Sequence, residues 1–474
     1  MKSEEKLYHA ITELPDELVE EAEEQPKKQK KSRRMLMTGL IAACLVCALT
    51  ITAVWSRLKG GGKALYTDML LLQVQYPKAY SFNDSDAHHE NWTQNAVEDD
   101  FYEAVNAFSY ETASALLSAA GGNINYSPVS LYYALAVMAE GAKGDTQEEI
   151  LGLLKAADIQ ELGEQCAKLY HLLYRKNEIG QLTIGNSLWV DKSVNIRQEY
   201  VDRLAESYFT ESYRADFSEK AAYQAMEDWV FDWTKGLKFE SEPQENTAAV
   251  FLNAVYYYDE WTDKFNKDKT KEDTFYVDED TEVRCDFMNS HYSSHNFTVG
   301  EGWTRSTLSL KNSGSMVFVL PDEGVDVHEL LASPERLRDV LRGGEGGCGE
   351  VVWQIPKFSF GSQMNLNEAL LGLGIRTAFS QEEADFSGMG TIDEAVESEG
   401  GAENIFIGRI LQDTHIAIDE NGVEAKAFTR VDYAGAAMPT GRADMILNRP
   451  FLYAVTNNRG VVIFIGICEN PASE

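Results

Sequence analysis

The sequence predicts an α+β fold, because two kinds of apolar pattern occupy different parts of the chain. Apolar residues at helical spacing come early in the large domain, and short runs rich in β-branched and aromatic residues come late. Long stretches separate these runs, and no internal repeat is found, which favours an α+β arrangement. Only 11 of the 474 residues are proline, so most of the chain is expected to bury a core.

Two helices are predicted first. Apolar residues at helical spacing cover 100–118, and Ser127-Pro128 opens a second, strongly apolar helix that ends at glycines. Strands are predicted from the runs AVFLNAVYYY (249–258), SMVFVLP (315–321), VVWQIPKFSF (351–360), FLYAVTNN (451–458) and GVVIFIGICENP (460–471). The first of these runs is continuously apolar, as expected of a buried central strand. The last two flank Asn457-Asn458-Arg459-Gly460 and predict a hairpin.

An uncharged run, residues 35–55, is long enough to cross a bilayer, since a helix of this length spans about 31 Å. The basic segment KKQKKSRR (27–34) precedes it, and the positive-inside rule places that side in the cytoplasm. We therefore predict a cytoplasmic tail over 1–34, a transmembrane signal anchor over 35–55, an extracytoplasmic spacer over 56–94 and a large extracytoplasmic domain over 95–474. The chain is thus expected in the cell membrane, crossing it once.

Two other fates of the apolar run stay open. Ile41-Ala42-Ala43-Cys44 resembles a lipobox, the site at which bacterial lipoproteins are cut and acylated on cysteine. Cleavage of the run as a signal peptide would instead release a secreted protein. The length of the run and the 34 residues before it favour the retained anchor.

Charge and motifs exclude several classes of function. With 76 acidic and 42 basic residues, the formal net charge is −34, which repels nucleic-acid backbones. No GxSxG, HExxH or GxxxxGK[ST] motif occurs, so no catalytic residue is predicted. The pair His291 and His295 lies between strand-like runs and is interpreted as surface loop, and the cysteines form no framework. No metal and no cofactor are expected.

Five segments, in the same order along the chain, carry a resemblance to the serpin family. They are NINYSPVSLYYALAVMAEGAKGDTQEEIL (123–151), IGNSLWVDKSVNIRQEYVDRLAESYFTESYRADF (184–217), VFLNAVYYYDEWTDKF (250–265), IPKFSFGSQMNLNEALLGLGIRTAFSQEEADFSGM (355–389) and NRPFLYAVTNNRGVVIFIGICENP (448–471). The resemblance covers about residues 99–472 and leaves out the tail and the apolar run. The chain is identified as resembling a bacterial-type serpin with an N-terminal membrane anchor.

The resemblance implies a fold with a large central β-sheet, surrounding helices and an exposed reactive-centre loop. It also implies a suicide inhibitor, not an enzyme. A serine protease cuts the loop, which then inserts into the main sheet and traps the protease as a covalent complex. A monomer is expected. Two alternatives stay open: a non-inhibitory serpin acting as a binding or scaffold protein, and a hydrolase, for which no nucleophile with a histidine base is visible.

The segment before the expected cut alternates as an inserting strand should. One face carries only small or β-branched residues, namely Val423, Ala425, Ala427, Thr429 and Val431. The other face carries Glu424, Lys426, Phe428, Arg430 and Asp432. Gly422 precedes the strand pattern and is expected to act as a hinge with an unusual φ. Family spacing from Gly422 places the reactive bond at Ala436–Ala437, with Ala437–Met438 as the second choice. A small residue before the cut predicts an elastase-type protease.

The resemblance also implies a cluster that controls opening of the sheet. Ser127, Ser130 and Asn253 match this cluster, and Gln412 stands where the family usually has a histidine. An amide can both donate and accept hydrogen bonds, so the cluster is expected to form with Gln412 as its fourth member.

Overall fold

The structure, a computed structural model, describes residues 65–118, 120–236, 247–392, 405–423 and 441–473. All of them fall in the second of the two units into which the chain divides, Ala64–Glu474, and the description below concerns that unit alone. The predicted cytoplasmic tail (1–34) and transmembrane helix (35–55) lie outside the described residues. Within the described ranges, no helix is both long enough and apolar enough to cross a membrane.

Helices dominate the first half of the described chain, as the sequence predicts. The α-helices are α4 (Ser85–Gln94), α5 (Asp99–Leu117), α6 (Pro128–Gly141), α7 (Gly144–Leu154), α8 (Ile159–Leu173), α9 (Gln198–Tyr208), α10 (Lys220–Thr234), α11 (Pro334–Arg342) and α12 (Asn367–Gly372). Short 3-10 helices are η1 (Leu65–Met69), η2 (Lys267–Lys269), η3 (Val327–Leu331) and η4 (Thr377–Phe379). Both predicted helices are confirmed, as α5 and α6.

Helix α6 is buried on every side, which explains its apolar sequence. Every residue of the helix except Glu140 is buried. Pro128 occupies the first turn, where its fixed φ suits a helix and its missing N–H costs no hydrogen bond. A helix that is apolar all round belongs inside a core and cannot lie on a surface.

The strands dominate the second half. They are β1 (Leu70–Leu72), β2 (Ile124–Tyr126), β3 (Arg175–Lys176), β4 (Gly180–Asp191), β5 (Val194–Ile196), β6 (Thr210–Ala215), β7 (Ala249–Glu260), β8 (Lys271–Tyr276), β9 (Glu282–Gly300), β10 (Trp303–Ser309), β11 (Ser315–Pro321), β12 (Glu345–Pro356), β13 (Phe358–Asn365), β14 (Gly390–Ile392), β15 (Leu411–Ile418), β16 (Gly422–Val423), β17 (Gly441–Ile446), β18 (Phe451–Thr456) and β19 (Val462–Cys468). The predicted strands and the final hairpin, β18–β19, are confirmed.

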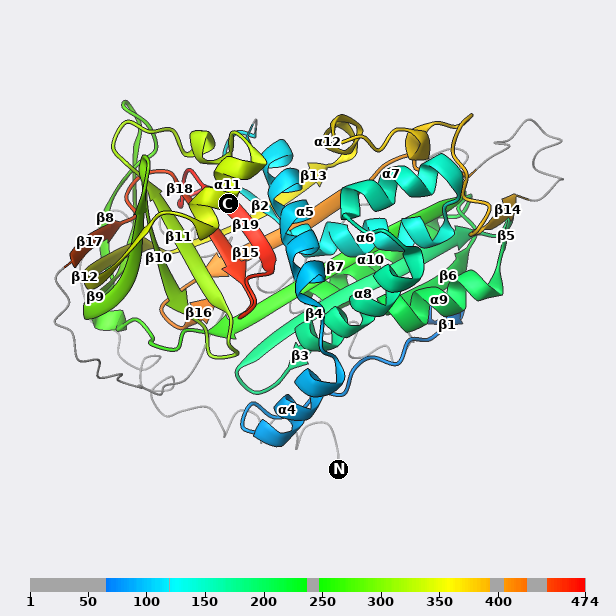
Figure 1. Cartoon of the computed structure of the whole chain (residues 1–474), viewed down its shortest axis with the longest axis horizontal. Helices are drawn as coiled ribbons and strands as arrows, with labels where there is room; N and C mark the ends of the chain where they lie inside the picture. The colour runs from blue at the N-terminus through cyan, green and yellow to red at the C-terminus, as the bar shows by residue number, and fades with distance from the viewer. Residues whose placement is uncertain (1–64, 119, 237–246, 393–404, 424–440, 474) are drawn as a thin grey trace, which may run out of the picture. The chain divides into compact units, whose positions relative to one another are not determined.

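Most of the strands belong to two sheets. The first has the order β1-β6-β4-β7-β16, with β3 on the end of β4. The second has the order β17-β12-β9-β10-β11-β18-β19-β2, with β8 on β9. Strands β13 and β15 form a separate pair, and β5 pairs with β14. Figure 1 shows β15 running beside the long strands of the first sheet.

Helices cover both faces of the first sheet. On one face, α10 packs against Trp189 of β4 and Ala254 of β7. On the other face, α6 belongs to the main core together with Val255 and Tyr257 of β7. Successive residues of β7 therefore face α10 and α6 in turn, as the pleat of a strand requires.

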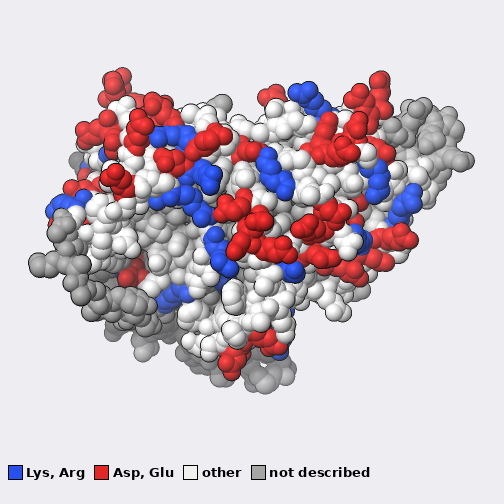
Figure 2. Space-filling model, in the orientation of Figure 1, with Lys and Arg blue, Asp and Glu red and all other residues white. Residues whose placement is uncertain are grey.

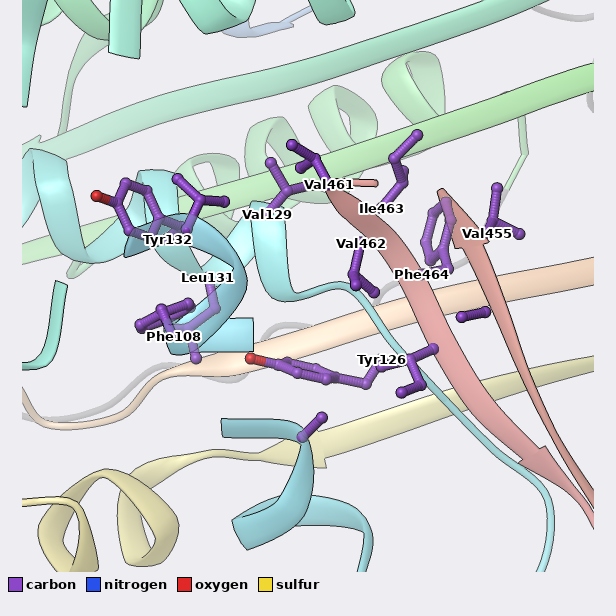
Figure 3. Close-up of a cluster of buried hydrophobic side chains, with 14 of the residues drawn as sticks. Phe108, Tyr126, Val129, Leu131, Tyr132, Val455, Val461, Val462, Ile463 and Phe464 are labelled. Carbon is purple, nitrogen blue, oxygen red and sulfur yellow. The ribbon is translucent and has the colours of Figure 1, made fainter. Parts of the chain in front are cut away.

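The main core lies where α5 and α6 meet the last hairpin. Figure 3 shows Phe108 of α5, Tyr126 of β2 and Leu131 of α6 gathered beside Val455 and Phe464 of β18 and β19. The surface, by contrast, is rich in charge. Acidic side chains outnumber basic ones on the face shown in Figure 2, in keeping with the net charge of −34.

Residues 65–94 are part of the fold, which corrects the spacer expected over 56–94. Strand β1 pairs with β6 at the edge of the first sheet, with Leu70 opposite Tyr213. The Tyr66 hydroxyl donates to Asp232 of α10 at 2.9 Å, and Asn91 of α4 donates to the carbonyl of His171 at 3.0 Å. The apolar residues between Leu65 and Leu72 thus find their partners far along the chain, and the folded unit begins well before residue 95.

Candidate functional site

Strands β7 and β15 stand on either side of an opening in the sheet. Strand β7 pairs with β4 along one edge, and β15 pairs with β13 over its whole length. Between the edges that face each other, no ladder connects the described residues of β7 and β15. A cavity of about 230 Å³ lies there, lined by both strands together with α6 and α10. The first sheet is therefore split, and two strand edges face an unfilled space.

This opening changes one prediction about β7. The continuous apolar run predicted a buried central strand, yet most side chains of β7 are only half-buried. The prediction of a strand is confirmed, and the prediction that it is central and fully buried is wrong over most of its length. The reason is that one edge of β7 pairs with a full-length neighbour, whereas the other pairs only at Asp259 and Glu260.

The four residues predicted as the sheet-opening cluster meet at the start of α6. Ser130 Oγ donates to Asn253 Oδ1 on β7. Ser127, at the N-terminal end of α6, is bonded through its backbone to Gln412 on β15. Asn253 Nδ2 in turn donates to Asn186 Oδ1 on β4 at 2.6 Å. The first turn of α6 is thus hydrogen-bonded to both strands that border the opening.

Both the oxygen and the nitrogen of the Gln412 side-chain amide form hydrogen bonds. The Oε1 atom accepts from the backbone N–H of Ser127 at 2.8 Å, and Nε2 donates to the carbonyl of Ser127 at 3.0 Å. Gln412 is 5% exposed and Ser127 is fully buried, so these bonds lie away from solvent. His415, on the same strand, is exposed and contacts Ser359. The residue in the expected place is therefore the glutamine, as predicted from the spacing.

Gly422 is needed for a close approach of two backbones. It pairs with Glu260, and a Cβ added to Gly422 would lie 2.4 Å from the carbonyl oxygen of Asp259. Its φ is not among the positive φ values of the described glycines. The expected unusual φ is therefore wrong, and the reason for glycine is the space between strands. Val423, the next residue, is 4% exposed and lies opposite Asp259.

The residues just before Gly422 are held firmly. The indole Nε1 of Trp261 donates to the carbonyl of Asp419 at 2.9 Å. The carboxylate of Glu420 accepts from Thr270 Oγ1 at 2.7 Å and pairs with Lys357 at 3.2 Å. Burial alone would raise the pKa of Glu420, but these hydrogen bonds outweigh it and hold the pKa below its usual value. The chain is thus held in place on the N-terminal side of Gly422.

Two buried carboxylates at the end of β7 were missed by sequence reasoning. Asp259 is 1% exposed, and burial raises its pKa to about 6, although Arg175 and hydrogen bonds from Asn312 oppose this. Glu260 is fully buried and pairs with Lys311 at 2.8 Å and with Lys264 at 3.5 Å. Their position directly after an apolar strand and before Trp261 was the available signal. Both lie opposite β16, whose Val423 is the last described residue before 441.

The rest of the predicted loop lies outside the described residues. This concerns the inserting face at Ala425, Ala427, Thr429 and Val431, and the reactive-bond residues Ala436, Ala437 and Met438. The described chain resumes at β17, whose first residue is Gly441.

The histidine pair is placed differently from its prediction. His291 and His295 lie within the long strand β9, so their interpretation as surface loop is wrong. His291 Nε2 contacts Glu350 at 2.9 Å, and His295 Nε2 contacts the carbonyl of Thr307 at 3.0 Å. Across the described part of the chain, no three metal-ligating side chains come together.

Comparison with known proteins agrees with this geometry. A family model, described as Serpin (serine protease inhibitor), matches residues 103–471. The chain is 31% identical over 366 residues to an alpha-1-antitrypsin-like protein of Tamias sibiricus, covering 74% of this chain and 84% of the relative. It is 29% identical over 370 residues to Serpin-ZX of Arabidopsis thaliana, covering 74% and 92%. The solved structure of a thermophilic serpin, tengpin, in the native state matches with a TM-score of 0.70 at 25% identity, over 84% of this chain and 97% of that one.

The chain therefore belongs to the serpin family. Its fold of helices around large β-sheets is the serpin fold. Members of this family are in general inhibitors of serine proteases and not catalysts, although some are non-inhibitory.

Proposed function

We propose that this chain is a suicide inhibitor of elastase-type serine proteases. In this proposal the protease cuts Ala436–Ala437, and residues 424–436 then insert between β7 and β15. The observation that carries the proposal is β16, because the two residues that precede the loop already pair with β7 at the foot of the opening.

The pairing of β16 gives a register that can be continued. On one side Val423 lies opposite Asp259 of β7 in an antiparallel pair. On the other side Gly422 lies opposite Asp419, which directly follows β15. Continued antiparallel along both strands, residues 424–431 would fill the opening as a strand between them.

In that register Thr429 would lie opposite Asn253 on one side and Gln412 on the other. Asn253 faces α6, so the odd-numbered loop residues would face α6 as well. These are the small and β-branched residues of the alternating pattern. Lys426 would face the side of α10, as Ala254 does. In this register the small residues of the loop would therefore face the α6 side of the sheet, and its charged residues would face the α10 side.

Insertion would supply enough free energy to compete with the fold of a trapped protease. Each hydrogen bond added to the ladders contributes ~0.5–1.5 kcal/mol net. About ten inserted residues would thus yield on the order of 10 kcal/mol, which is comparable to the stability of a whole domain. The elastase-type target follows from the small side chain of Ala436, which fits a shallow specificity pocket.

The test is a gel of the full chain incubated with neutrophil elastase and boiled in detergent. A covalent band near the sum of the two masses is expected. Ala436→Arg serves as the matched variant, since it should move trapping from elastase to a trypsin-like protease. Undiminished trapping of elastase by Ala436→Arg would show that the reactive bond lies elsewhere, with Ala437–Met438 the next choice.

A second candidate is a non-inhibitory serpin that binds a ligand or acts as a scaffold. Human thyroxine-binding globulin, solved in complex with its ligand, matches with a TM-score of 0.67 at 25% identity. The same gel separates the two functions. A chain that is only clipped, with no covalent band for any serine protease, would favour this candidate.

We also propose that residues 35–55 anchor the inhibitor in the cell membrane, with 1–34 in the cytoplasm. The support is the uncharged run after KKQKKSRR. A protease that cannot cross the membrane should remove the large domain from intact cells and leave an epitope on 1–34 protected. A lipid on Cys44 would select the lipoprotein route, and a free large domain in the medium would select secretion. The bacterial assignment rests on these N-terminal features alone, since the curated relatives named above come from a plant and a mammal.

A further inference from the structure

An exposed group of charges lies on strands β9, β12 and β17, close to Gly441, where the described chain resumes. Glu350 of β12 is its centre. It pairs with His291 of β9 at 2.9 Å and with Arg442 of β17 at 3.1 Å. Arg442 also pairs with Asp444 at 2.8 Å. We call these four residues the β17 charge cluster.

The alternation of the strands turns this cluster toward solvent. On β17, Ala443 and Met445 are buried, so Arg442 and Asp444, which alternate with them, point outward. The side chains of Glu350, Asp444, His291 and Arg442 are between 40% and 55% exposed. Within the described residues, β17 pairs only with β12 and so forms an edge of its sheet, as Figure 1 shows.

The cluster is within reach of any protein bound at the proposed reactive bond. Arg442 is five residues beyond Ala437, so the chain between them spans at most about 17 Å. A standard protein–protein interface buries about 800 Å² on each partner, which corresponds to a patch with a radius of about 16 Å. A protease centred on Ala436–Ala437 would therefore cover the cluster or bring its rim against it.

The chemistry of the cluster fits a basic partner. Asp273 lies on the same side of the sheet, where Gln354 donates to it at 2.9 Å, so carboxylates outnumber guanidinium groups there. Ion pairs as exposed as these contribute little to stability. Glu350 and Asp444 can therefore exchange Arg442 for a basic side chain of another protein at a small cost in free energy. The net charge of −34 would attract such a protein from a distance.

We infer that the β17 charge cluster is a second contact surface for the target protease, and that it binds a basic loop beside the protease's active-site cleft. This inference rests on the proposed function and adds a feature of the partner. Charges at the rim of an interface change mainly the association rate and its dependence on salt. The cluster should therefore govern how fast the protease is captured and leave untouched how completely it is trapped.

The test compares two double variants of the full chain that change the net charge equally. Glu350→Gln with Asp444→Asn alters the cluster, and Glu164→Gln with Glu206→Gln alters exposed residues on α8 and α9. The probe is neutrophil elastase, a cationic enzyme. Association rates and the number of inhibitor molecules consumed per trapped protease are measured at about 50 mM and 500 mM salt. Binding to elastase with its catalytic serine replaced by alanine is measured in parallel.

We expect the cluster variant to associate about three-fold more slowly at low salt or slower still, to lose most of its salt dependence and to keep its stoichiometry. The control variant should change much less. Equal rates for the two variants would overturn the inference, as would unchanged binding of the cluster variant to inactive elastase. A lower melting temperature with an unchanged rate would assign the cluster to holding β17 and would also overturn it. A wild-type chain that traps no protease would instead remove the proposed function itself.

Discussion

Replacing Gln412 tests whether the sheet-opening cluster holds the native state together. In Gln412→Ala, the backbone N–H of Ser127 loses its partner, whereas its carbonyl loses the bond from Gln412 but keeps the one from the N–H of Leu131 at 3.3 Å. Ser127 is fully buried, so water does not replace the lost bonds. An unsatisfied buried donor costs about 1–3 kcal/mol and the lost bond to the carbonyl about 0.5–1.5 kcal/mol, so the free energy of unfolding should fall by about 1.5–4.5 kcal/mol. That is a large part of the stability of a typical domain.

The measurement is unfolding of the full chain in urea, followed by tryptophan fluorescence. The first unfolding midpoint of Gln412→Ala should move clearly to lower urea. Gln363→Ala is the matched control, because Gln363 is an exposed glutamine on the neighbouring strand β13. Its change should stay within about 0.5 kcal/mol. Gln412→His should recover part of the loss, because an imidazole can also donate through one nitrogen and accept through the other.

The comparison of the two alanine variants decides the outcome. If Gln412→Ala and Gln363→Ala shift the midpoint equally, the bonds from β15 to α6 contribute nothing particular to the native state. If Gln412→Ala is destabilised and Gln412→His is equally so, the effect comes from lost packing volume, and the hydrogen-bonding argument is wrong.

Three further outcomes follow from the same site. Burial raises the pKa of Asp259 to about 6 from the usual 3.8, so the folded chain binds this proton more tightly, and about 3 kcal/mol of stability present below pH 4 is lost as the pH rises through 6. The difference in urea midpoint between pH 4.5 and pH 7.5 should therefore change in Asp259→Asn, and an unchanged difference would contradict the buried carboxylate. Thr429→Arg should turn the inhibitor into a substrate because it would place an unpaired charge under the sheet, whereas Lys426→Glu should keep its stoichiometry; equal losses in the two variants would contradict the register. Cleavage near Ala436 should raise the melting temperature of the full chain, and a lowered or unchanged value would argue against insertion.

The sequence predicts β7, β11, β12, β13, β18 and β19, because alternation and apolar runs are local signals, but it misses others such as the long strand β9. It does not predict that β7 and β15 stand apart. The run of β7 is apolar and β-rich, whereas β15 is polar over 412–415, and nothing in either one shows which of its edges is paired. Which distant segments pair is decided by how all the helices and strands of the fold pack together. The half-burial of β7 is therefore visible only once its neighbours are known.

The dependence on distant partners also explains why the sequence analysis took the region of Leu70 for a spacer and missed the buried carboxylate of Asp259. The run that contains Leu70 looks like a spacer between glycines and polar residues, although its strand partner lies at Tyr213. Asp259 looks like a polar end to a strand, although Asn312 and Arg175 from other hairpins enclose it. Ser127, Asn253 and Gln412, in contrast, come together at the start of α6 as family spacing led us to expect, and their role in opening the sheet stays a prediction.

The pairing of β1 with β6 limits how far a membrane-anchored form of this chain could reach, and with it where the proposed inhibition could take place. If residues 35–55 are held in a membrane, only residues 56–64 separate that anchor from the first described residue of the fold, Leu65. Ten peptide units extend at most on the order of 35 Å. The tethered domain would then stay in a thin layer next to the cell, with little more height above the lipid than its own size. Proteases bound to the cell surface or arriving there would be captured, and those in the surrounding medium would be left alone.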